Sequence, residues 1–130
     1  MFQTVSPQQI FDPRYWQVSD AHPAYWLAQL RKADWQELLQ FLEIKVNSSA
    51  RKPALASAVL ERLEFAVCDT RADAWHAWSL MLAEQGRGLV IQFRHSETDW
   101  TRGIPEFVRL ERCEPLMYVN IASCLVCKVR

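Results

Sequence analysis

The chain has little glycine, no net charge and no long apolar run, and each of these shortages narrows what it can be. Three Gly and six Pro, the prolines mostly where elements would start, favour helices with defined ends. No segment is apolar for long enough to cross a bilayer, so we expect no membrane contact. The 15 basic residues balance the 15 acidic ones. That balance counts against a dedicated non-specific nucleic-acid binder, whose affinity comes from neutralising phosphates.

The compartment and the number of domains are expected from the same composition. Residues 1–4 lack the basic start and apolar run of a secretory signal, and we therefore expect a cytoplasmic protein. In that compartment the four cysteines are expected to be reduced thiols. Half of the residues are hydrophobic, which at this length is enough to bury one core. We expect residues 1–130 to form a single domain.

Helix-start signals recur through the first two thirds of the chain. Ser6, Pro7 and Gln9 have the pattern of a capping box, in which side chain and backbone bond reciprocally, and Pro13 is expected to end that helix. A box of Asp34 and Glu37 is expected to open another helix. The complete set of helices is predicted to begin at Ser6, at Asp20 to Pro23, at Asp34, at Pro53 and at Thr70, with Gly86 or Gly88 ending the last.

The hydrophobic period changes from helix to strand near residue 88. Leu89, Ile91 and Phe93 alternate with Val90 and Gln92, which is typical of a strand. Further strands are predicted over 107–113, 116–121 and 124–129, and their short connections favour an antiparallel meander. The predicted fold is α+β: four or five N-terminal helices packed on a three- or four-stranded antiparallel sheet within a β-rich end, 88–130, against which the Trp75 helix packs.

One segment, residues 33–64, resembles a known helix–loop–helix. Leu38 and Leu42 stand where SAP-type modules have first-helix leucines, and Val46 stands where they have a buried loop residue. The other matching positions are the basic pair Arg51-Lys52, the anchor Leu55 and the closing pair Arg62-Leu63. Ser49-Ala50 replaces the glycine of the family pattern, which lets the loop turn tightly.

The resemblance implies contact with nucleic acid through the loop and the start of the second helix. Free N–H groups and the positive end of a helix favour phosphate there, and such contacts position a backbone without reading bases. The implied contact residues are Lys45, Ser48, Ser49, Arg51 and Lys52. The alternative is an ordinary helical hairpin with a solvated basic loop.

Aromatic residues beside arginine form a second kind of candidate site. Trp16, Trp26 and Trp100 lie in or beside polar, Pro-containing segments where full burial is difficult, and aromatic–Arg pairs are typical of protein–protein hot spots. The predicted protein-contact residues are Arg14, Tyr15, Trp16, Trp100 and Arg102. The alternative is that these aromatics cover the edge of the core.

The spacing of cysteine and histidine residues allows a test of two possible chemical sites, a zinc site and a cysteine nucleophile. Cys124 and Cys127, with Cys113 and either Cys68 or His95, supply four zinc ligands by type. We predict no metal site, because residues three apart in a strand point to opposite faces.

A nucleophile at Cys68 with His76 as base is disfavoured, since the acidic neighbours of Cys68 oppose a thiolate. Paired carboxylates at catalytic spacing are also lacking. We therefore predict a non-enzymatic interaction protein, an adaptor or inhibitor with a protein partner and no cofactor. The alternative is a nucleic-acid-associated accessory protein that uses the 45–52 loop.

Overall fold

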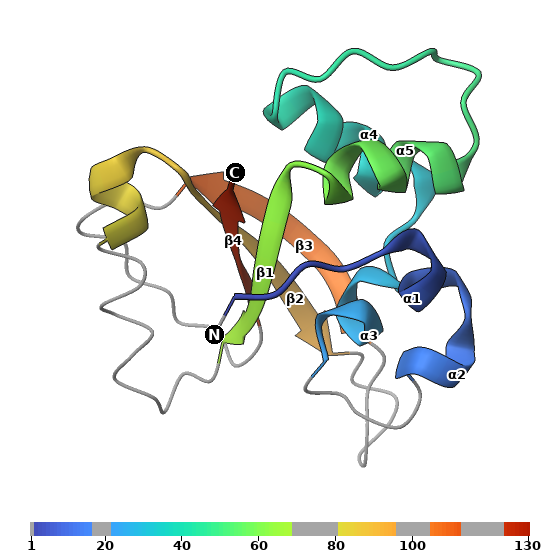
Figure 1. Ribbon diagram of the computed structural model, residues 1–130, viewed down its shortest axis with the longest axis horizontal. Helices are drawn as coiled ribbons and strands as arrows, with labels where there is room; N and C mark the ends of the chain where they lie inside the picture. The colour runs from blue at the N-terminus through green and yellow to red at the C-terminus, as the bar shows by residue number, and fades with distance from the viewer. Residues whose placement is uncertain (1, 17–21, 69–80, 96–104, 113–123) are drawn as a thin grey trace.

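The computed structural model describes residues 2–16, 22–68, 81–95, 105–112 and 124–130, and they form the predicted α+β fold, with N-terminal helices followed by a four-stranded antiparallel sheet (Figure 1). A further helical stretch, 81–85, precedes the second strand. No helix in the described ranges is long and apolar enough to cross a membrane. The named elements are α1 Pro7–Phe11, α2 Pro13–Trp16, α3 Pro23–Leu27, α4 Lys32–Phe41, α5 Lys52–Leu60, β1 Leu63–Cys68, β2 Gly88–His95, β3 Pro105–Arg112 and β4 Cys124–Val129.

The helices begin where side chains satisfy free backbone groups. At α1 the predicted capping box is confirmed: Ser6 Oγ accepts the Gln9 N–H at 3.4 Å and Gln9 Oε1 accepts the Ser6 N–H at 2.9 Å. The box predicted for α4 was placed too late. That helix begins at Lys32, and the Asp34 carboxylate accepts the N–H of Arg31, the residue before the helix, at 2.8 Å. Asp34, the third residue of α4, therefore satisfies the backbone N–H of the residue that precedes the helix.

Two helices end in the same Schellman arrangement, in which a residue with positive φ reverses the chain. After α4, Glu43 has φ 58°, its N–H bonds to Gln40 O at 3.1 Å, and the Ile44 N–H bonds to Leu39 O at 2.9 Å. After residues 81–85, Gly86 has φ 64° and ends the helix, which settles the predicted choice between Gly86 and Gly88. The corresponding bonds run from Gly86 N–H to Ala83 O at 3.1 Å and from Arg87 N–H to Leu82 O at 3.0 Å.

The sheet has the strand order β1-β4-β2-β3, and every neighbouring pair is antiparallel. The predicted meander was wrong, because β4 lies between β1 and β2 rather than at an edge. The β-rich region also starts earlier than 88, since Leu63, predicted on the second helix of the helical hairpin, begins β1. On its other side β1 makes an isolated bridge from Phe65 to Gln3, with two backbone bonds of 2.8 Å.

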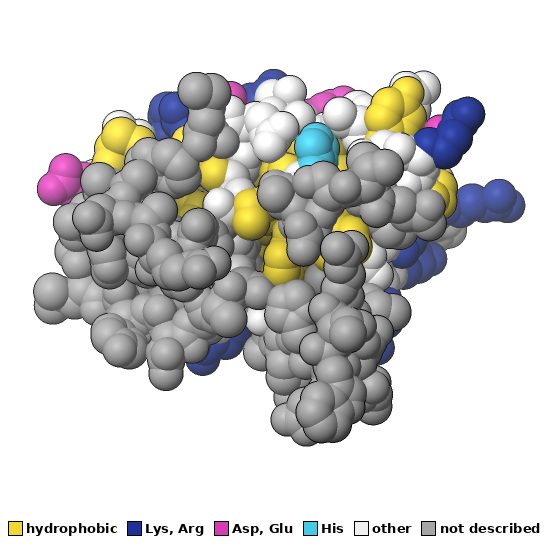
Figure 2. Space-filling model, turned by 90° about the horizontal axis from the view of Figure 1, so that it is seen from below, with side chains coloured by type: hydrophobic (Ala, Val, Ile, Leu, Met, Phe, Trp, Pro, Cys, Tyr) yellow, Lys and Arg dark blue, Asp and Glu magenta, His cyan; other side chains and the backbone are white. Residues whose placement is uncertain are grey.

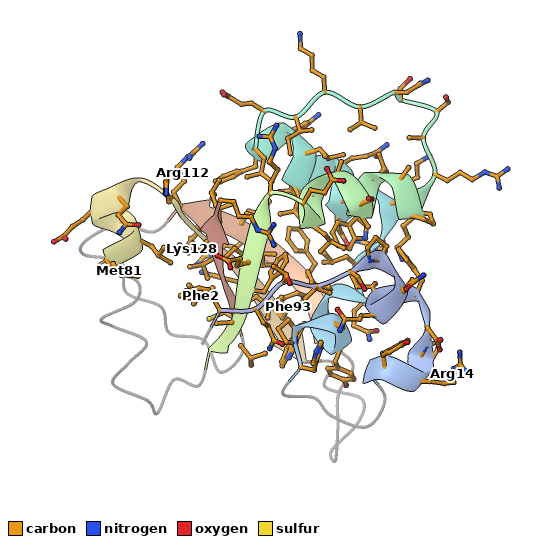
Figure 3. The ribbon with its side chains drawn as sticks, in the orientation of Figure 1. Phe2, Arg14, Met81, Phe93, Arg112 and Lys128 are labelled. Atoms are coloured by element: carbon orange, nitrogen blue, oxygen red, sulfur yellow. The ribbon has the colours of Figure 1, made fainter. Side chains whose placement is uncertain are left out.

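The two faces of the sheet bury different clusters. One face packs against the helices, and there the Trp26 and Phe93 rings lie 5.3 Å apart; Phe93 is labelled in Figure 3. The expectation that Trp26 would resist full burial was wrong, because α3 turns its ring into this core. The other face buries Leu82 with Val90, Cys124 and Val126. Cys127 belongs to the first cluster and Cys124 to the second. The two thiols thus face opposite sides of β4, as the strand spacing predicted.

Candidate interaction surface

The outer helices α1 and α2 present aromatic and basic side chains to solvent. Of the large hydrophobic residues in the described ranges, Tyr15 is 54% exposed and Phe11 39% exposed. Arg14 lies beside Tyr15 with 88% of its side chain exposed, at the end of the molecule away from the sheet (Figure 3). Pro13 begins α2 directly after Asp12, the residue that ends α1. Phe11 and Tyr15 therefore lie on two separate short helices and do not share one buried helix face.

Asp12 holds the Arg14 guanidinium in one orientation. Arg14 Nε donates to both carboxylate oxygens at 3.0 and 3.1 Å, and its Nη2 donates to Oδ2 at 2.7 Å. The Asp12 Oδ1 also accepts the Arg14 N–H at 3.1 Å. These hydrogen bonds from Arg14 lower the pKa of Asp12 below its ordinary 3.8. The pair is solvated, so its value lies in orienting Arg14 rather than in stabilising the fold.

Lys52 joins the start of α5 to this surface. Its Nζ lies 5.9 Å from the centroid of the Phe11 ring, a cation–π distance. A residue from the predicted nucleic-acid set therefore touches the helix that precedes the predicted protein-contact set. Figure 2 shows Lys and Arg side chains projecting from the right-hand edge of the molecule, the side on which α1 and α2 lie in Figure 1. We call Phe11, Arg14, Tyr15 and Lys52 the aromatic–basic surface.

The loop 44–51 is anchored at both ends and exposed between them. Ile44 and Ala50 pack against the main core, whereas residues 45–49 are exposed. Asn47 Oδ1 accepts the Ser49 N–H at 3.0 Å and the Ser49 hydroxyl at 2.9 Å. This side-chain turn replaces the glycine turn of the SAP-type pattern and occupies the Ser49 hydroxyl.

The start of α5 offers few backbone donors to a phosphate. Pro53 has no N–H, and the N–H groups of Ala54 and Leu55 bond to Arg51 O at 3.0 and 3.1 Å. At most the N–H of Lys52 is left in the first turn. Lys45 and Arg51 are exposed, so a phosphate bound here would depend on their side chains more than on the backbone N–H groups that the sequence predicted.

A hollow of about 550 Å³ lies between α4, the loop and α5. Val46 was expected to be the buried loop residue, but it is 36% exposed, and Ile44 instead packs on the core. The closing pair Arg62-Leu63 lies beyond α5. The lining residues are Gln36, Leu39, Gln40, Ile44, Lys45, Val46, Asn47, Ser48 and Leu55.

A polar cluster occupies the opposite face of the sheet from the helices. Gln92 is buried, and its amide donates to Glu111 Oε2 at 2.8 Å and accepts from Arg109 Nε. Arg109 and Glu111 also form an ion pair at 3.1 Å. Their groups satisfy one another, which makes the cluster structural.

Several predicted site residues cannot be placed. Outside the described residues lie Trp100, Arg102, Cys113, His76, the predicted Thr70 helix up to residue 80 and the strand predicted over 116–121. The side chains of Trp16, Cys68 and His95 also lie outside them. Among the described residues no three His, Cys, Asp or Glu side chains gather as they would around a metal ion. Phe11 and the glutamines of α4 were not predicted as site residues from the sequence. The (i, i+4) spacing of Gln36 and Gln40 was the available signal, because it places both amides on one helix face.

Comparisons with known proteins add no family to this description. A scan against protein-family models, a search of curated proteins and a search of solved structures each found no match.

Proposed function

We propose that the chain is a non-enzymatic interaction protein, an adaptor or inhibitor, that binds a protein partner through its aromatic–basic surface. The observation that carries this proposal is the exposed Tyr15 beside an Arg14 that is both solvent-facing and held by Asp12. Tyr and Arg are enriched at interface hot spots. They lose little freedom on binding when they are already oriented.

The neighbouring contacts fit the same role. Lys52 lies over the Phe11 ring, and this cation–aromatic pair joins α1, the helix that precedes α2, to the start of α5. Asp12 pairs with Arg14, so the surface combines apolar area with the positive charge of Lys52 and with an oriented Arg14. It suits a partner that offers acidic side chains around an apolar patch. Trp16, Trp100 and Arg102 remain proposed members of the contact set on sequence grounds.

The test is affinity capture from cells with wild-type, Tyr15→Ala and Arg62→Ala chains, followed by titration of the protein that the wild type recovers. Arg62 is exposed and lies beyond the far end of α5, which makes it a matched surface control. Truncation of a hot-spot Tyr is expected to cost about 2 kcal/mol or more, roughly 30-fold in Kd. Equal affinity of the Tyr15→Ala and wild-type chains would remove the surface, and Trp16→Ala and Trp100→Ala test the remaining aromatics.

The second candidate function is contact with nucleic acid through Lys45, Ser48, Ser49, Arg51 and Lys52. The observation that favours it is a run of sequence, 44–60, with three basic residues and no acidic one. Neither Lys45 nor Arg51 forms an ion pair with another described residue.

An anisotropy titration against DNA and RNA at low and high salt tests this candidate. Three phosphate contacts predict a slope of log K against log salt of about −2 to −3. The doubly substituted Arg51→Ala, Lys52→Ala chain should flatten the slope, while Arg87→Ala, another exposed arginine, should not. Absence of binding at low salt would eliminate the candidate, and an unchanged slope in the double variant would eliminate the site.

A further inference from the structure

The hollow under the 44–48 loop has an apolar floor and a polar rim. Leu39 and Leu55 are buried members of the core, and Ile44 and Val46 add aliphatic surface from the loop. Amide and hydroxyl groups from both sides complete the lining; they belong to Gln36, Gln40, Asn47 and Ser48. Figure 1 shows the loop arching away from the two helices that it joins. A volume of about 550 Å³ is within the range of small-ligand and peptide-side-chain sites.

Val46 lines the hollow and is left partly exposed to solvent. An aliphatic side chain of the loop would ordinarily turn inward between the two helices, because burial removes its apolar surface from water. Here the loop is anchored on the core at Ile44 and Ala50 instead, and Val46 is left 36% exposed beside the hollow. An apolar group brought by a ligand would therefore cover Val46 and complete the contact between α4 and the loop.

The charge of the lining selects the kind of ligand. Lys45 is its one charged residue, and Arg51 follows it on the exposed loop. Glu37 and Glu43 are exposed nearby on α4 and its end but do not line the hollow. A carboxylate next to an apolar side chain complements this arrangement, since a charge-assisted bond to Lys45 would form at the rim.

The amides at the rim favour a peptide over a nucleic acid. Gln36 and Gln40 each carry a donor and an acceptor, which match the N–H and C=O groups of an extended peptide. The lining has no aromatic ring on which a base would stack. We propose that the hollow binds a short extended segment of a partner protein that presents one aliphatic side chain flanked by Glu or Asp. The site is distinct from the aromatic–basic surface and stands whether or not that surface binds a partner.

The test uses labelled hexapeptides of defined sequence and the full chain enriched in ¹⁵N. Each probe carries Leu, Ile, Val or Met at one position with Glu on either side, and its matched controls replace the aliphatic residue by Ser or both Glu by Lys. Backbone signals of Val46 and side-chain amide signals of Gln36 and Gln40 report on the hollow. At least one Glu-flanked probe should shift them below about 1 mM, and neither control probe should.

Two charge-reversal variants, one in the hollow and one outside it, test whether the peptide binds at this site. Lys45→Glu is expected to weaken the best probe at least about tenfold, because it places a carboxylate against a carboxylate. Arg87→Glu reverses an exposed arginine outside α4, the loop and α5 and should leave binding unchanged. Tyr15→Ala should also leave it unchanged, which separates this site from the proposed aromatic–basic surface.

Four results would overturn the proposal. They are no shift at Val46, Gln36 or Gln40 with any probe; equal binding of the Ser control; equal binding to Lys45→Glu; and occupation by something else. Two experiments would detect another occupant of the hollow. A single-stranded oligonucleotide that shifts these signals where the peptides do not would assign the hollow to nucleic acid, and shifts that follow protein concentration alone would assign it to a second copy of the chain.

Discussion

The ends of α4 and of the 81–85 helix allow one backbone effect to be tested in both directions. Each ends in the same pair of hydrogen bonds around a left-handed residue, but that residue is Glu43 at one end and Gly86 at the other. A side-chain-bearing residue in this region pays about 1–2 kcal/mol in strain. Glycine loses about 0.5–1 kcal/mol more backbone freedom on folding. The difference predicts that Glu43→Gly stabilises the fold by about 0.5–1 kcal/mol.

Gly86→Ala should have the opposite effect of similar size. A Cβ at Gly86 would meet no atom within 4 Å, so only the backbone conformation contributes, and the expected loss is about 0.5–1 kcal/mol. Urea unfolding measures both changes. With a slope of about 1.5 kcal/mol per M, the midpoint should move about 0.3–0.7 M, upward for Glu43→Gly and downward for Gly86→Ala.

A charge control separates the backbone effect from electrostatics. Glu43→Gln removes the negative charge but keeps the strained φ, so its midpoint should stay close to that of the wild type. A lower midpoint for Glu43→Gly, or an unmoved one for Gly86→Ala at constant slope, would refute the reasoning. A rise in Glu43→Gln equal to that in Glu43→Gly would assign the effect to the charge instead.

The remaining predictions concern the sheet and the Arg14 clamp. Because β4 lies between β1 and β2, successive amides of 125–128 should all exchange slowly with deuterium; rapid exchange at every second amide would place β4 at an edge. The lowered pKa of Asp12 means that its pair with Arg14 is intact above the ordinary value of 3.8 and is lost as pH falls through the lowered pKa. A carboxyl NMR titration should find a midpoint below 3.8, and Arg14→Gln should raise it toward that value, because the side-chain hydrogen bonds are lost while the N–H of residue 14 still donates to Asp12. Identical midpoints in the two chains would contradict the clamp.

Much of the fold could be predicted from patterns among residues that are close together in the sequence. The Ser6 box, the Gly86 stop and the alternation of Leu89, Ile91 and Phe93 all concern residues within a few positions of each other. Such patterns predict caps and strands because the groups that satisfy each other are neighbours in the chain. They also predicted that Cys124 and Cys127 face apart, which required only the period of a strand.

Relations between distant segments were not accessible in the same way. Leu63 stands three positions after Leu60, a helical spacing, and only pairing with Val129 makes it the start of β1. The contact of Lys52 with Phe11 likewise joins two helices that no local pattern connects. Val46 was misplaced because the family pattern was applied to a loop in which Ile44 and Ala50 already provide the anchors.

The division of the molecule explains why its candidate sites lie on helices and loops. Cys124, Leu125, Val126 and Cys127 are buried in succession, so β4 has apolar contacts on both faces and a hydrogen-bonded strand on each side. In the described part of the chain, this central strand of the sheet therefore has no exposed face or edge at which a partner could bind. The helical end is less constrained: α1 and α2 are short, and the α4–α5 loop is anchored only at its ends. A chain with no net charge can still bind there, because the acid-free run 44–60 concentrates positive charge beside apolar surface.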